Sequence, residues 1–123
     1  MTELQIALHS LAQAVDAPRV TGTALGNWRW TVRQRMAAVR EGLARETAEA
    51  PDGWLAARET TVLRDRNALI TRLSVLGQGV LESPEVEQVR ADLKRLLTDI
   101  QHYRQKVHDL AYDAVEIELG GSE

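Results

Sequence analysis

Apolar residues recur at steps of three and four along most of this chain, which is the spacing of residues on one face of an α-helix. Four stretches follow the pattern, at about 3 to 15, 24 to 49, 54 to 76 or 81, and 86 to 117. We therefore predict an all-α protein, an antiparallel up-and-down helical bundle of three long helices and a short N-terminal helix.

The stretch from 86 to 117 has the most regular pattern. Its apolar residues alternate steps of three and four without interruption, a spacing typical of helices that pack as in a coiled coil and cross at about 20°. We expect one unbroken helix of roughly 50 Å. The residues of this seam are Val86, Val89, Leu93, Leu96, Ile100, Tyr103, Val107, Leu110, Ala114 and Ile117.

The other three segments carry stripes of the same kind and have recognisable ends. Thr2 and Gln5 fit a capping box at the first helix, and residues 50–53 and 83–85 carry turn signals. The stripes are Leu4, Leu8, Leu11 and Val15; Leu25, Trp28, Val32, Met36, Val39 and Leu43; and Leu55, Val62, Leu69, Leu73, Leu76 and Val80.

Short connections make neighbouring helices antiparallel, so the predicted turns also predict which residues face each other. Aligning the helices about these turns places Leu69 near Leu96 and Val32 near Ile70. The first helix is expected to cover one end of the bundle. From Tyr112 onward the last helix has no obvious partner in the chain.

The composition fits a single globular domain spanning residues 1–123. Hydrophobic residues make up 44% of the chain and charged residues 27%, which is too apolar for disorder. Cysteine is absent, which excludes disulfides and thiolate chemistry. Neither a membrane-spanning run nor a secretory signal is present, so we expect a cytoplasmic protein with no membrane partner.

Charge is distributed unevenly, although the net charge is only −3. We expect the basic and acidic segments to compensate each other within the fold or between subunits. Nucleic-acid binding through the basic segment is a less favoured alternative, because the whole chain is acidic. The basic segment carries Arg19, Arg29, Arg33, Arg35, Arg40 and Arg45, and the acidic end carries Asp109, Asp113, Glu116, Glu118 and Glu123.

No motif in the sequence predicts catalysis, a cofactor or a metal. The three histidines, His9, His102 and His108, lack the Glu-x-x-His spacing of helical di-iron sites. Ser10 follows His9, but adjacent residues of a helix point apart. We therefore expect a protein that is not an enzyme and that has neither a metal nor a cofactor.

Polar residues also interrupt the predicted seam of the third helix. The alignment places Arg66 beside Asp99 and Glu59 beside Lys106, which suggests ion pairs that set the register of the bundle. The alternative is a mid-bundle polar pocket that binds a small anionic ligand. Its lining would be Arg66, Asp99, His102 and Tyr103.

Trp30 lies about 200° around the second helix from Trp28, at 100° per residue, and so points away from the apolar stripe. Either the first helix or a loop covers it, or it is an exposed interface anchor beside Arg29 and Arg33. In the second case Arg33 could stack on the indole ring.

The last turns of the fourth helix form a second candidate surface, made of Tyr112, Val115, Ile117 and Leu119. Apolar surface without an intrachain partner is commonly an association site, although frayed last turns are the alternative. The favoured interpretation is a non-enzymatic protein-interaction module that associates with itself as a symmetric homodimer. The pattern indicates no particular protein family.

Overall fold

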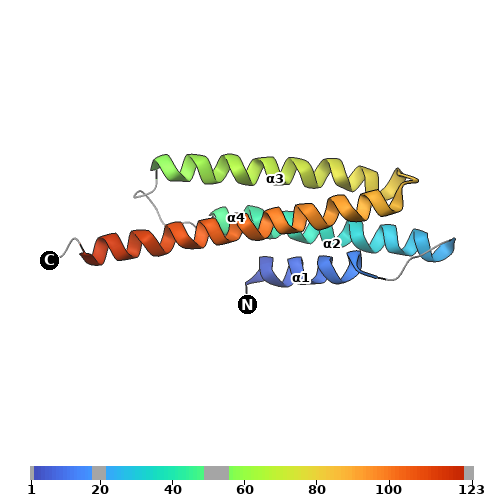
Figure 1. The fold of residues 1–123 in the computed structure, drawn as a ribbon, viewed down its shortest axis with the longest axis horizontal. Coiled ribbons are helices and arrows are strands. Elements are labelled where there is room, and N and C mark those ends of the chain that lie inside the picture. The colour runs from blue at the N-terminus through green and yellow to red at the C-terminus, as the bar shows by residue number, and fades with distance from the viewer. Residues whose placement is uncertain (1, 18–21, 49–55, 121–123) are drawn as a thin grey trace.

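The computed structural model describes residues 2–17, 22–48 and 56–120, with side chains placed for 2–17, 22–45 and 61–110. Four helices make up these ranges: α1 (Glu3–Val15), α2 (Thr23–Ala48), α3 (Ala56–Glu82) and α4 (Val86–Gly120). The described ranges contain no strand. The predicted all-α bundle is confirmed (Figure 1).

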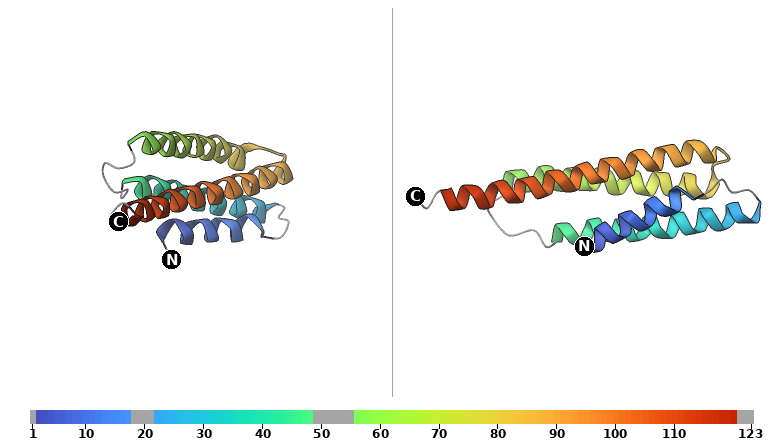
Figure 2. Two further views of the ribbon diagram at one scale, coloured as in Figure 1. Left: turned by 60° about the vertical axis from the view of Figure 1, so that its left-hand side comes forward. Right: turned by 60° about the horizontal axis from the view of Figure 1, so that its bottom comes forward.

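The helices form an antiparallel ring. Backbone contacts join α1 to α2, α2 to α3, α3 to α4, and α4 to α1, while in the described residues none joins α1 to α3 or α2 to α4. Figure 2 shows the same arrangement from two further sides. Each helix therefore packs against two neighbours and turns its apolar stripe toward a common core.

The sequence suggests that α1 covers one end of the bundle. The structure differs, because α1 lies alongside α2 and α4. The expectation fails because α1 packs very closely against α2. Gly42 of α2 permits this, since a Cβ built on it would lie 3.1 Å from the Cα of Leu4. At the start of α1, the predicted capping box is present: the Gln5 amide donates to Thr2 Oγ1 (3.1 Å) and the Thr2 amide to Gln5 Oε1 (2.8 Å).

Within the described side chains the predicted apolar stripes form the core, whereas Leu55, Ala114 and Ile117 lie outside the described side chains. The side chains described as buried contain no polar or charged residue, so the core is stabilised by apolar burial and packing. Val62, Leu76, Val86 and Val107 are partly buried at its edge. The fully buried large side chains are Leu4, Leu8, Leu11, Val15, Val32, Met36, Val39, Leu43, Val80, Leu93, Leu96 and Ile100.

The register between α3 and α4 differs from the prediction. Asp99 Oδ2 accepts a hydrogen bond from Arg72 Nη1 at 2.7 Å, and Arg72 is six positions along from the predicted partner Arg66. Lys106 Nζ lies 2.9 Å from Asp65 Oδ2, again six positions along from the predicted partner Glu59. The cause is that α3 continues past Gly77 to Glu82, which moves the turn. A helical glycine costs about 1 kcal/mol relative to alanine, and burying the nearby Val80 completely offsets that cost.

The register between α2 and α3 is also displaced. The predicted alignment places Val32 opposite Ile70, but Arg33, the next residue, lies against Gly77. The displacement is about eight residues along α3, or roughly 12 Å at 1.5 Å per residue. The predicted alignment assumed a tight turn at residues 50–53, whereas α2 ends at Ala48 and α3 begins at Ala56.

α4 is one continuous helix of 35 residues, as the heptad pattern predicts. Because Asp65 pairs with Lys106, the start of α3 at Ala56 lies opposite residue 115, nine positions further along each helix. The last turns of α4 therefore extend beyond α3, and Figure 1 shows this end projecting past the other helices. Within the described residues no helix has the length and apolarity required to span a membrane.

Candidate functional site

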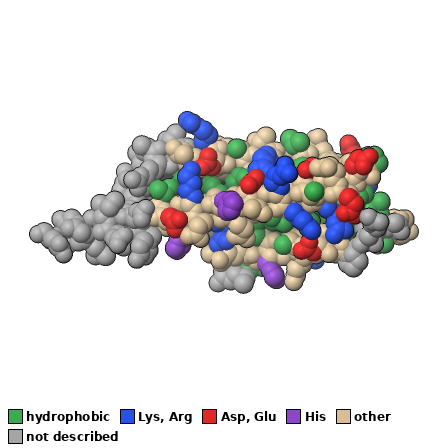
Figure 3. All heavy atoms as spheres, in the orientation of Figure 1, with side chains coloured by type: hydrophobic (Ala, Val, Ile, Leu, Met, Phe, Trp, Pro, Cys, Tyr) green, Lys and Arg blue, Asp and Glu red, His purple; other side chains and the backbone are tan. Residues whose placement is uncertain are grey.

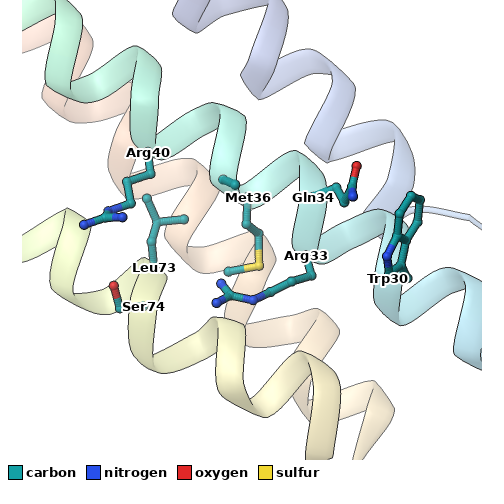
Figure 4. Close-up of a pocket in the computed structure, with 8 residues that line it drawn as sticks. Trp30, Arg33, Gln34, Met36, Arg40, Leu73 and Ser74 are labelled. Atoms are coloured by element: carbon teal, nitrogen blue, oxygen red, sulfur yellow. The ribbon is translucent and has the colours of Figure 1, made fainter.

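An open groove of about 450 Å³ runs along the junction of α2 and α3 (Figure 4). Its floor is apolar, because Met36 of α2 and Leu73 of α3 are both buried core residues. We call it the α2–α3 groove. Its lining residues are Trp30, Arg33, Gln34, Met36, Ala37, Arg40, Leu73 and Ser74.

Trp30 lies at one edge of this groove and is 62% exposed, which is unusual for the largest apolar side chain. α1 does not cover it, because α1 packs on another face of α2. On that face the indole Nε1 of the buried Trp28 donates to the carbonyl of Ala14 at 2.9 Å. The two tryptophans therefore differ as the spacing predicts: Trp28 belongs to the core and Trp30 to the surface.

Arg33 extends from α2 across to α3. Its Nη1 occupies the space that a Cβ on Gly77 would need, so the absence of a side chain at Gly77 allows the guanidinium to lie there. Figure 4 shows the guanidinium turned away from the ring of Trp30. The stacking of Arg33 on Trp30 that the sequence suggested is therefore absent.

The two segments that flank the groove contain only basic charges. Residues 23–40 of α2 and 66–81 of α3 carry Arg29, Arg33, Arg35, Arg40, Arg66 and Arg72 and no acidic residue. Figure 3 shows another face of the molecule, with α4 toward the viewer, on which acidic and basic side chains are interspersed. Of these arginines, Arg33 and Arg40 line the groove, and no acidic residue lines it, so the groove is locally positive although the chain is acidic overall.

Most of these arginines have bonded partners within the chain. Arg35 donates to the carbonyl of Ser10, Arg66 to the side chain of Asn67, and Arg72 to Asp99. Arg33 and Arg40 form no hydrogen bond or ion pair with any described residue. The two arginines that line the groove are thus the ones left to bind an external group.

Arg29 has a structural role. Its Nη1 donates to the carbonyl of Val80 at 2.9 Å and its Nη2 to the carbonyl of Ser83 at 2.8 Å. These carbonyls lie at the end of α3, where backbone acceptors lack helical partners and where a positive charge is favourable. Arg29 therefore joins α2 to the end of α3, whereas the sequence placed it on a partner surface with Trp30 and Arg33.

The predicted mid-bundle polar site corresponds to a second open groove, of about 320 Å³, between α3 and α4. Asp99, His102 and Tyr103 line it as predicted, but Arg66 does not. The cause is the register shift, which brings Arg72 to Asp99 in place of Arg66. Both cations of this groove, Arg72 and Lys106, are paired with carboxylates.

The histidines lie at the surface. His9 and His102 are exposed, and His108 is 3.8 Å from Asp109. Among the described residues no three histidine, aspartate or glutamate side chains come together in a way that could hold a metal ion.

The second predicted surface lies at the end of α4, where only the positions beyond 115 extend past α3. Residues Tyr112, Val115, Ile117 and Leu119 belong to the helix, but their side chains lie outside the described residues. The part of the site that the sequence missed is the contribution of α3, from Leu73, Ser74 and Gly77. Only the correct register between α2 and α3 could have revealed these residues.

Comparisons with protein-family models, curated proteins and solved structures find no match to this chain. The assignment of a function therefore depends on the geometry and charge of the chain itself.

Proposed function

We propose that this protein is a non-enzymatic helical interaction module that binds a protein partner through the α2–α3 groove, and that this partner is a second copy of itself. One observation carries the proposal. Trp30 is 62% exposed at the edge of a groove whose two arginines, Arg33 and Arg40, have no bonded partner among the described side chains.

This combination of residues favours a protein partner. Tryptophan and arginine are enriched among the few residues that dominate binding energies at protein interfaces. A partner that covers Trp30 removes a large apolar surface from water, and its carboxylates can pair with Arg33 and Arg40. The apolar floor formed by Met36 and Leu73 would accept an apolar side chain between those charges.

The groove between α3 and α4 supports a binding function less well. Its cations Arg72 and Lys106 lie 2.7 and 2.9 Å from the carboxylates of Asp99 and Asp65. An anionic ligand would have to displace these carboxylates. In the α2–α3 groove, an anionic group can bind the guanidinium groups of Arg33 and Arg40 without displacing a carboxylate of the chain.

Light scattering of the purified protein across a range of concentrations tests the proposal. We expect the average mass to rise from monomer toward dimer, and we expect Trp30→Ser to abolish the rise without changing the free energy of unfolding. Ile6→Ser is the matched control, because Ile6 is 55% exposed on α1, away from the groove. This control should associate like the wild-type chain.

Two results would overturn the proposal. One is a wild-type chain that stays monomeric at every concentration while binding a labelled DNA duplex at low salt, which would make the groove a nucleic-acid surface. The other is an equal loss of association in Trp30→Ser and Ile6→Ser, which would show that association depends on exposed apolar surface in general.

A further inference from the structure

The end of α4 has the opposite charge to the α2–α3 groove. Residues 109–118 carry Asp109, Asp113, Glu116 and Glu118 and no basic residue. The groove segments carry arginines and no acid. Charge complementarity therefore relates these two parts of one chain.

Only the last residues of α4 extend past the described helices of its own chain, because residues 109–115 lie opposite residues 56–62 of α3. The pairing of Asp65 with Lys106 places the first residue of α3 opposite residue 115, so the positions beyond 115 extend past α3. Figure 1 and the right-hand view of Figure 2 show this end of α4 projecting from the bundle. A helix that continues beyond its own bundle is accessible to another molecule.

The spacings of the two charge patterns match. Arg33 and Arg40 are seven residues apart on α2, and Asp109 and Glu116 are seven residues apart on α4. In a helix both spacings correspond to two turns, or roughly 10.5 Å at 1.5 Å per residue. Asp113 falls between the two acids at an i+4 position, which places all three positions on one face.

We propose that the α2–α3 groove binds the acidic end of α4, residues 109–119, from a second copy of this chain, and that the exchange is reciprocal in a symmetric dimer. This inference rests on the proposed function and names its partner segment. Each groove then receives the partner's acidic helix end, so that two identical contacts close the dimer without leaving a free groove.

Paired charge reversals test the inference. The groove variant Arg33→Glu/Arg40→Glu and the tail variant Asp113→Arg/Glu116→Arg should each stay monomeric, with dissociation constants raised about tenfold or more. Mixed at equal concentrations, they should form a heterodimer, because each groove then meets a tail of opposite charge. Sedimentation velocity measures all three samples.

Control variants separate the local charges from the change in net charge. Arg64→Glu/Arg95→Glu changes the net charge as much as the groove variant, at exposed arginines outside the groove. Glu82→Arg/Glu85→Arg does the same for the tail variant at exposed acids of the α3–α4 turn. Both should dimerise like the wild-type chain. If the groove variant fails to fold, the single substitution Arg40→Glu replaces it in the same experiment, because Arg40 is exposed.

The outcomes distinguish this inference from the proposed function. If the groove variant is monomeric but the tail variant still dimerises, the groove is a protein interface and its occupant is not the end of α4. A mixture that stays monomeric overturns the reciprocal exchange. If neither variant affects association, both the inference and the proposed function fail.

Discussion

The guanidinium of Arg33 lies in the space that a side chain on Gly77 would fill. This contact joins α2 to α3 beside the α2–α3 groove, which Arg33 lines. It also links the stability of α3 to the binding surface, because the glycine weakens the helix while allowing the arginine to lie against it.

Replacing Gly77 with alanine should therefore separate stability from binding. Alanine favours the helix by up to about 1 kcal/mol, and the displaced group is the end of a flexible side chain. We expect the free energy of unfolding to change by no more than about 1 kcal/mol and self-association to weaken. Gly79→Ala is the control, because a Cβ there meets nothing within 4 Å. Equal association of the two variants would show that the position of Arg33 is unimportant.

Replacing Gly42 with alanine should lower the free energy of unfolding, whereas replacing Gly77 should leave it nearly unchanged. A Cβ at Gly42 would lie 3.1 Å from the Cα of Leu4, which is backbone and cannot move without shifting α1. We expect Gly42→Ala to lower the free energy of unfolding by about 1–3 kcal/mol, as overpacking does in other cores. Urea denaturation measures the change. Gly26→Ala, where a Cβ meets nothing within 4 Å, should be neutral or stabilising.

Arg29 should contribute to stability more than the other arginines of α2. Replacing it with glutamine removes two charge-assisted hydrogen bonds to the carbonyls of Val80 and Ser83. We expect a loss of about 1–3 kcal/mol in the free energy of unfolding. Arg40→Gln, at an exposed residue with no bonded partner, should change it by no more than about 0.5 kcal/mol. Similar losses in both variants would contradict the structural role of Arg29.

Local patterns in the sequence predicted the helices and the core well. The seam of α4 depends only on residues three and four apart, so Leu93, Leu96 and Ile100 could be assigned to the core without knowing the fold. The direction of Trp30 away from the core follows in the same way, from its angle to Trp28, although that angle left open whether another segment covers it. These predictions are confirmed because helical periodicity and apolar burial act in the same direction.

Contacts between helices were harder to predict, because register depends on where helices end. The sequence places a turn at residues 50–53 and leaves the end of α3 uncertain near Gly77. Both choices shift the alignment, by about eight residues for α2 with α3 and by six for α3 with α4. Arg66 was therefore assigned to Asp99 in place of Arg72, and the meeting of Arg33 with Gly77 was missed.

The register of α3 against α4 can be measured directly with double-mutant cycles. Arg72 and Asp99 form an ion pair at 2.7 Å with both side chains 40% exposed, so we expect a coupling energy of up to about 1 kcal/mol. The cycle of Arg66 with Asp99 is the control and should give a value near zero, because Arg66 bonds to Asn67. The reverse result would move α3 by six residues along α4. It would also remove Leu73, Ser74 and Gly77 from the groove and leave Arg33 without the surface on which it lies.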